Sequence, residues 1–100
     1  MTIEPRAYVY ILASGRNGTL YTGSTTNLEG RIAEHKQGLL PGFTRRYGVT
    51  NLVWYEAFES LHDARDHEYA MKRWRRAWKL ALIEKSNPDW IDLAESWNLG

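Results

Sequence analysis

The chain of 100 residues contains no cysteine, which excludes disulfides, a cysteine nucleophile and a zinc site of the Cys/His type. It also contains no glycine-rich phosphate loop. No stretch approaches the roughly 18 apolar residues of a membrane helix, and residues 1–6 lack the basic start and apolar run of a signal peptide. We therefore expect a cytoplasmic protein, one domain over residues 1–100, with no membrane contact and no small-molecule cofactor.

Charge is distributed unevenly, although the net charge is only +1. Residues 61–79 hold six Lys/Arg against three acids, whereas residues 80–100 hold one lysine against four acids. A basic helix can follow the phosphates of a nucleic acid. It can equally be an ordinary solvated helix face, and the pattern alone leaves both interpretations open.

A β-hairpin is predicted near the start of the chain. Residues 7–13 are apolar on both faces, which is typical of a strand covered on both sides, and residues 19–23 resume strand character after a run of turn-forming residues. A four-residue loop over residues 14–17 predicts that Tyr10 lies opposite Tyr21. Both phenols then share one face, whereas a slip of one residue would separate them.

The next element is predicted to be a helix. Residues 26–29 have the form of a capping box, so the helix should begin at Asn27 and end near Gly38. Arg31 and His35 are four residues apart and therefore lie on the same side of this helix, beside its apolar stripe. The side chains expected in the core are Leu28 and Ile32.

Residues 37–48 are rich in glycine and are interpreted as a loop that carries Arg45, Arg46 and Tyr47. Basic and aromatic residues on a loop can hold a nucleic acid strand, but an ordinary connecting loop is an equal alternative. Residues 51–58 are rich in β-branched and aromatic side chains, which predicts a third strand.

A second long helix is predicted to begin at Ser60. Its expected inward stripe contains Leu61, Ala64, Met71, Trp74 and Trp78. Continuing the stripe between Ala64 and Met71 reaches Glu68, so a carboxylate occupies a position of the buried face. Such a group needs a partner, and it could be a metal ion or simply Lys72 one turn later.

No glycine or proline marks a break before the helical run ends near Pro88. Residues 89–97 then predict a short amphipathic helix with Trp90, Leu93 and Trp97 pointing inward. Its acidic character could shield the basic segment, but the shared side of the three apolar residues favours a role in capping the core.

The candidate residues suit phosphodiester hydrolysis. One carboxylate binds Mg²⁺ weakly, and the remaining ligands of this ion usually come from water and phosphate oxygens. Arg31 can supply a permanently charged donor to a phosphate. A tyrosine acts as a base at neutral pH only where nearby positive charge or a hydrogen bond favours the phenolate, because its ordinary pKa is about 10.

The spacing of these residues resembles the GIY-YIG nuclease family. Tyr8-Val9-Tyr10 is followed after ten residues by Tyr21-Thr22-Gly23, and Arg31, His35, Glu68 and Asn87 match later positions of the family pattern. Two departures are Tyr8 in place of the first glycine and Thr22 in place of the isoleucine of the second triplet. The chain is most similar to the small, single-domain bacterial branch.

The resemblance implies an α+β fold, a three-stranded antiparallel sheet flanked by helices, and cleavage assisted by one metal ion. It further implies that Tyr10 is the general base, with His35 orienting it or taking its proton, and that Tyr21 holds water or phosphate. Arg31 would bind the scissile phosphate and Glu68 the metal. Asn87 would support the site.

Two main hypotheses follow, and a protein-interaction domain is a third. The first is an endonuclease that uses Mg²⁺ or Mn²⁺ to cleave DNA, and the second is a nucleic-acid-binding module without turnover. The filled catalytic positions favour the first. In both cases the residues expected to contact nucleic acid are Arg45, Arg46, Lys72, Arg73, Arg76 and Lys79.

Overall fold

The computed structural model describes residues 6–40 and 42–97. The expectation about a signal peptide concerns mainly residues 1–5, which lie outside this range. The described part contains three strands and four helices, in the order β1 (Ala7–Ala13), β2 (Leu20–Thr25), α1 (Leu28–Lys36), α2 (Phe43–Tyr47), β3 (Asn51–Phe58), α3 (Leu61–Lys72) and α4 (Arg76–Ser86). Within it, no helix is long and apolar enough to cross a membrane. The α+β fold predicted from the sequence is confirmed.

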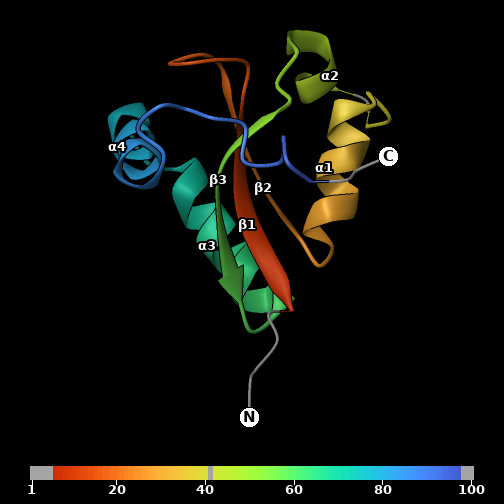
Figure 1. Cartoon of the computed structure of the whole chain (residues 1–100). Helices are drawn as coiled ribbons and strands as arrows, with labels where there is room; N and C mark the ends of the chain where they lie inside the picture. Colours follow the sequence, from red (N-terminus) through yellow and green to blue (C-terminus); the bar gives the residue numbers. More distant parts are fainter. Residues whose placement is uncertain (1–5, 41, 98–100) are drawn as a thin grey trace.

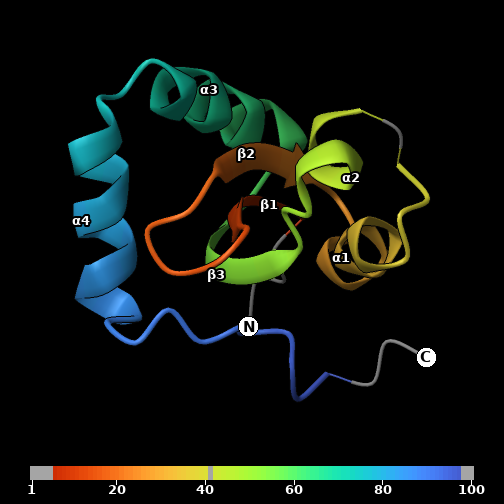
Figure 2. The same cartoon turned by 90° about the horizontal axis from the view of Figure 1, so that it is seen from above.

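The three strands form one antiparallel sheet in the order β2-β1-β3, with β1 in the centre (Figure 1). As predicted, β1 is covered on both faces. Val9 and Ile11 pack toward buried side chains of α3 and α4, whereas Tyr10 and Leu12 pack with Ile32 of α1. Figure 2 shows α4 and α1 on opposite sides of the sheet, with α3 on the side of β2. The edge strand β2 therefore lies next to α3.

The hairpin register differs from the prediction by two residues. Ala13 pairs with Leu20, and Tyr10 pairs with Gly23 rather than with Tyr21, so the loop is longer than expected. Hydrogen bonds between Ser14 and Thr19 close this loop. Because the shift is an even number of residues, it preserves the faces. Tyr10 and Tyr21 still lie on one face, with their ring centroids 6.3 Å apart.

Two local details of the next segment also differ. The side chain that caps α1 belongs to Asn27, which accepts a hydrogen bond from the Gly30 amide, so the helix begins one residue later than predicted. Gly38 follows the helix at φ +69°, as expected of a residue just beyond a C-terminus. The predicted loop over residues 37–48 contains the short helix α2, which ends at Gly48 in a left-handed conformation.

The basic helical run is broken after α3. Arg75 has an extended backbone, and α4 starts at Arg76, whose guanidinium donates to the carbonyls of Asn17 and Gly18 in the hairpin loop. This tertiary contact holds α4 at a new angle without any glycine or proline. Because the break changes the phase of the helix, Trp78 is 56% exposed, and the prediction that it points inward is wrong.

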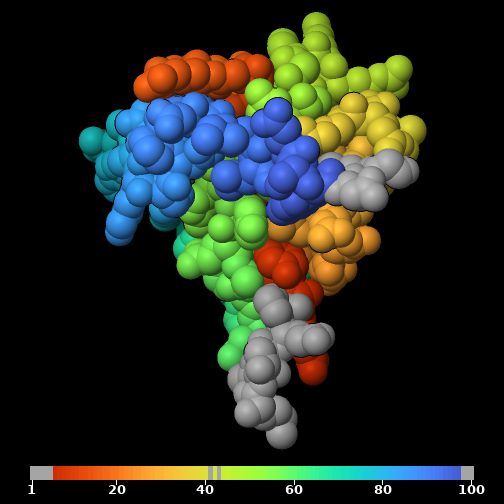
Figure 3. Space-filling model, in the orientation of Figure 1, coloured from red at the N-terminus to blue at the C-terminus, as the bar shows by residue number. Residues whose placement is uncertain are grey.

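The chain after α4 does not form the predicted helix over residues 89–97. It crosses the edge of β3, where the Leu93 amide donates to the Leu52 carbonyl, and Figure 3 shows it spread between α4 and α1. Trp90 packs with the core beneath α3 and α4, whereas Leu93 and Trp97 pack on the α1 face. The segment caps the core as expected, but its three apolar side chains do not share one side.

Candidate active site

Tyr10 and Gly23 form the centre of the candidate site. Tyr10 is 1% exposed, and its ring lies across β2 at Gly23. A Cβ atom at position 23 would lie 2.6 Å from the Tyr10 hydroxyl oxygen and 2.7 Å from the ring carbon that carries it. Glycine is therefore required for Tyr10 to lie across this strand.

His35 on α1 connects the Tyr10 hydroxyl to α2. Its Nε2 atom lies 3.0 Å from the Tyr10 oxygen, and its Nδ1 atom lies 3.0 Å from Oγ1 of Thr44. All three side chains are buried. Thr44 was not predicted, because the residue lies in a segment interpreted as a loop and a threonine there has no distinguishing spacing. The imidazole is thus fixed in orientation from both sides.

Burial keeps both groups neutral in the free protein. The pKa of Tyr10 is raised above its ordinary value, chiefly by burial and then by Tyr21, while Arg31 acts in the opposite direction. Burial, and then the Arg31 charge, lowers the pKa of His35 to about 4. A base role for Tyr10 thus requires further positive charge or a hydrogen-bonding substrate.

The neutral His35 predicts a pH dependence of stability. An unfolded histidine binds a proton below about pH 6.5, whereas the folded His35 does so only near pH 4. The unfolded state then binds more protons, so the free energy of unfolding should fall by about 1 to 3 kcal/mol as the pH drops through this window. Urea denaturation at several pH values measures this free energy of unfolding. Between about pH 6.5 and 4, stability should depend less steeply on pH in His35→Gln than in wild type. An equally steep dependence in the variant would contradict the lowered pKa of His35.

Arg31 lies beside this pair, on the same helix as His35. Its Nε atom is 3.8 Å from Glu34, and both side chains are less than half exposed to solvent at 41% and 45%. The Arg31 charge acts on both Tyr10 and His35. A fixed cation thus lies at the partly open margin of a buried phenol and imidazole, where an incoming phosphate could reach it.

Glu68 approaches the edge strand β2 from α3. One carboxylate oxygen accepts a hydrogen bond from Ser24 of β2, and the other lies 2.6 Å from Nζ of Lys72. The ion pair with Lys72 is therefore formed. The Lys72 ammonium also lies 6.0 Å from the centre of the Tyr21 ring, so Glu68 and the tyrosine face meet around the edge of β2.

Glu68 and its neighbours supply some, but not all, of the ligands that a hard divalent cation needs. Among the residues that the structure describes, no three His, Cys, Asp or Glu side chains gather into a metal-binding group. The Glu68 carboxylate and the Ser24 hydroxyl are nevertheless oxygen donors of the kind that Mg²⁺ prefers. A cation held there would take its other ligands from water and from the substrate.

Asn87 lies beside β3, the edge strand on the opposite side of the sheet from β2. Its amide nitrogen donates to the carbonyls of Val53 in β3 and Ile91, and its amide oxygen accepts from the Ile91 amide. These bonds hold the C-terminal segment against β3. The structure thus gives Asn87 a role in folding and does not bring it together with Tyr10 at the β2 edge.

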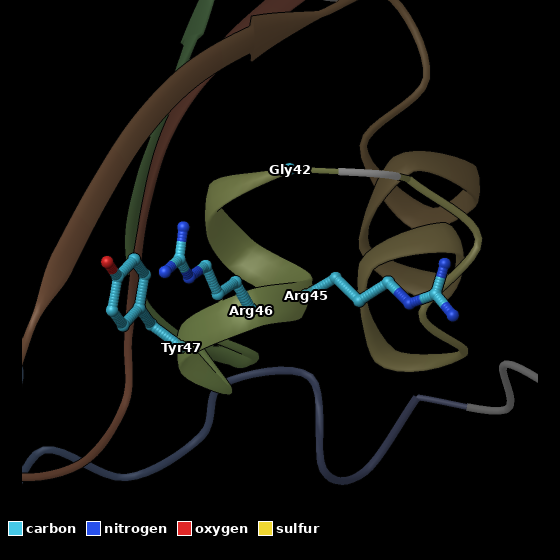
Figure 4. Close-up of a pocket in the computed structure, with 4 residues that line it drawn as sticks. All are labelled: Gly42, Arg45, Arg46 and Tyr47. Atoms are coloured by element: carbon cyan, nitrogen blue, oxygen red, sulfur yellow. The ribbon is translucent and has the colours of Figure 1, made fainter.

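The six expected nucleic-acid contacts separate into different environments. Arg45 and Arg46 line an open pocket with Gly42 and Tyr47, and Figure 4 shows the two arginines pointing in opposite directions. Arg76 is bonded to the hairpin loop, so its guanidinium has a structural role that the sequence did not indicate. Lys79 has a lowered pKa because of burial and then the charges of Arg76 and Lys72.

The fold and this arrangement of side chains define a GIY-YIG domain. The model of the GIY-YIG catalytic domain matches residues 6–81, so the chain belongs to the GIY-YIG family, whose members are typically nucleases.

More particular similarity is to proteins named UPF0213. A UPF0213 protein of Clostridium perfringens is 42% identical over 80 residues, which are 80% of this chain and 85% of that protein. One of Natronomonas pharaonis is 42% identical over 76 residues, or 76% and 88% of the two chains. The solution NMR structure of a UPF0213 protein from Bacillus halodurans has a TM-score of 0.53 at 34% identity and covers 90% of this chain and 96% of that one. The similarity thus extends over most of each chain.

Proposed function

We propose that this chain is a divalent-metal-dependent endonuclease that hydrolyses phosphodiester bonds in DNA, acting in the cytoplasm as a single domain. The observation that carries the proposal is that two hydrogen-bonded pairs of side chains meet at strand β2. Tyr10, bonded to His35, lies on one side of the strand, and Glu68, bonded to Ser24, reaches the same strand from α3. Family membership supports a nucleic acid substrate.

The proposed reaction requires a water molecule to lose a proton while negative charge builds on the phosphate. Tyr10 accepts this proton through its hydroxyl oxygen, once its own proton has passed to Nε2 of His35, 3.0 Å away. Thr44 fixes the ring of His35 for this transfer. The raised pKa of Tyr10 and the lowered pKa of His35 both oppose the transfer in the free protein. Substrate binding must therefore supply part of the driving force.

Charge on the phosphate is met from two directions. Arg31 lies at the margin of the tyrosine pair and donates to the scissile phosphate, and Tyr21 positions water or phosphate beside it. Glu68 and Ser24 would hold the divalent cation, which stabilises the leaving oxygen as a Lewis acid when bound. Flanking phosphates are contacted by Arg45, Arg46, Arg73 and Lys79.

A cleavage assay tests the proposal. Labelled single-stranded, double-stranded and branched DNA are incubated with the purified protein in Mg²⁺ or Mn²⁺, and matched reactions contain EDTA. We expect cleavage that EDTA stops and that added Mg²⁺ or Mn²⁺ restores. Binding in the same buffers should weaken steeply as salt is raised, because phosphate contacts release counter-ions.

Three results would decide against the proposal or one of its parts. Binding to DNA without cleavage in either metal would support the alternative, a nucleic-acid-binding module on the same scaffold. An equivalent RNA panel addresses the substrate, since cleavage confined to RNA would refute the assignment to DNA. Cleavage that continues undiminished in EDTA would refute the metal dependence.

A further inference from the structure

We propose that Lys72 is an exchangeable counter-ion of Glu68, which occupies the carboxylate in the free protein and leaves it when metal and nucleic acid bind together. This inference rests on the proposed function and concerns the same site. It assigns to Lys72 a role in controlling when the site becomes loaded, beyond the phosphate contact expected from its charge.

The first observation is that both oxygens of the Glu68 carboxylate are already engaged. Ser24 donates to one oxygen, and Nζ of Lys72 lies 2.6 Å from the other. Ser24 belongs to a strand that is paired with β1. The Lys72 side chain, in contrast, is 50% exposed, and its ammonium lies at the end of a flexible stem. A divalent cation that joins Glu68 therefore displaces the ammonium more easily than the hydroxyl.

The second observation is the local charge balance. Glu68 and Glu34 both act on Tyr10 as negative charges, and they are paired with Lys72 and Arg31 respectively. These four groups cancel in the free protein. A divalent cation that binds without nucleic acid therefore raises the net charge of the site from zero to about +2. Repulsion among these positive charges disfavours such binding. Each phosphate of a nucleic acid that enters with the cation removes about one unit of this excess.

Metal and nucleic acid should consequently strengthen each other's binding. The Lys72 ammonium lies 6.0 Å from the Tyr21 ring centre, so once released it remains beside the face where the phosphate is expected. A phosphate that attracts Lys72 frees Glu68 to bind the metal. Conversely, a metal that displaces Lys72 frees this lysine to bind the phosphate. Linkage requires that the two enhancements of affinity be equal.

Calorimetric titration of the full chain with Mn²⁺ tests this inference without any measure of activity. Lys72→Met removes the ammonium but keeps the apolar stem, and Lys85→Met removes one positive charge from an exposed site on α4. We expect Lys72→Met to bind Mn²⁺ roughly fivefold more tightly than wild type, because a partly exposed ion pair contributes up to about 1 kcal/mol. Lys85→Met should bind as wild type does, and circular dichroism confirms that both variants are folded.

A second titration measures the coupling. In a Tyr10→Phe background, which is expected to slow cleavage during the measurement, an oligodeoxynucleotide should raise the Mn²⁺ affinity more in the protein with Lys72 than in Lys72→Met. Equal Mn²⁺ affinities for Lys72→Met and Lys85→Met, with binding that Glu68→Gln abolishes, would overturn the inference and leave the metal assignment intact. No Mn²⁺ binding even with the oligodeoxynucleotide present, or binding that Glu68→Gln does not change, would overturn both.

Discussion

Tyr10→Phe should reduce the rate of DNA cleavage by about 10²- to 10⁴-fold, the usual contribution of a general base. The substitution removes only the hydroxyl that lies 3.0 Å from Nε2 of His35. The aromatic ring remains across Gly23, so the core keeps its packing. Single-turnover cleavage at saturating protein measures the chemical step separately from DNA affinity, which should stay within a factor of about two.

Tyr55→Phe is the matched control for this experiment. Tyr55 pairs with Tyr10 across β1 and β3 and is 41% exposed, so it loses a phenol hydroxyl from the neighbouring position without touching the bond to His35. We expect its cleavage rate to equal that of wild type. A Tyr10→Phe protein that cleaves at the wild-type rate would end the assignment of Tyr10 as the base, whatever the control shows.

Glu68→Gln should also have a large effect, because it removes the only carboxylate proposed to hold the metal. We expect cleavage to fall by at least about 10³-fold, since the loss of one preorganised electrostatic group alone costs about 10²- to 10³-fold. The glutamine amide keeps a hydrogen-bonding oxygen for Ser24, so the contact between α3 and β2 can persist. Cleavage is measured over a range of Mg²⁺ and Mn²⁺ concentrations.

Glu59→Gln provides the control for charge, because Glu59 is exposed in the turn between β3 and α3. It should cleave as wild type does at every metal concentration. Full activity of Glu68→Gln would refute the metal assignment. Activity that returns at high metal concentration would instead show that Glu68 sets the affinity and that other groups carry the chemistry.

Much of this architecture follows from short-range patterns. Strand β3 spans residues 51–58 as its β-branched and aromatic composition predicts, and Ser60 caps α3 as expected. The placement of Glu68 on an inward stripe correctly indicated a carboxylate with a partner, because helical periodicity fixes which side chains turn toward the sheet. The prediction that Tyr10 and Tyr21 share a face was correct although the predicted pairing was wrong, because a register shift of two residues leaves each side chain on the same face.

The features that escaped prediction depend on contacts between distant residues. The break before α4 has no local signal and is stabilised by Arg76 on the hairpin loop. Thr44 belongs to the site only because α2 returns to His35, and no spacing along the chain indicates this. Likewise, the apolar pattern of residues 90–97 suits a helix, but it is satisfied by a segment that passes from one face of the sheet to the other.

The passage of that C-terminal segment over β3 has a consequence for the solubility of the protein. An exposed strand edge presents unpaired amides and carbonyls, which can recruit strands of other molecules and cause aggregation. Here the Leu52 carbonyl accepts from Leu93, the Leu52 amide donates to Asp92, and the Val53 carbonyl accepts from Asn87. The irregular segment thus pairs with this part of the edge without offering a new strand of its own, and it keeps residues 52 and 53 of β3 from pairing with a strand of another molecule.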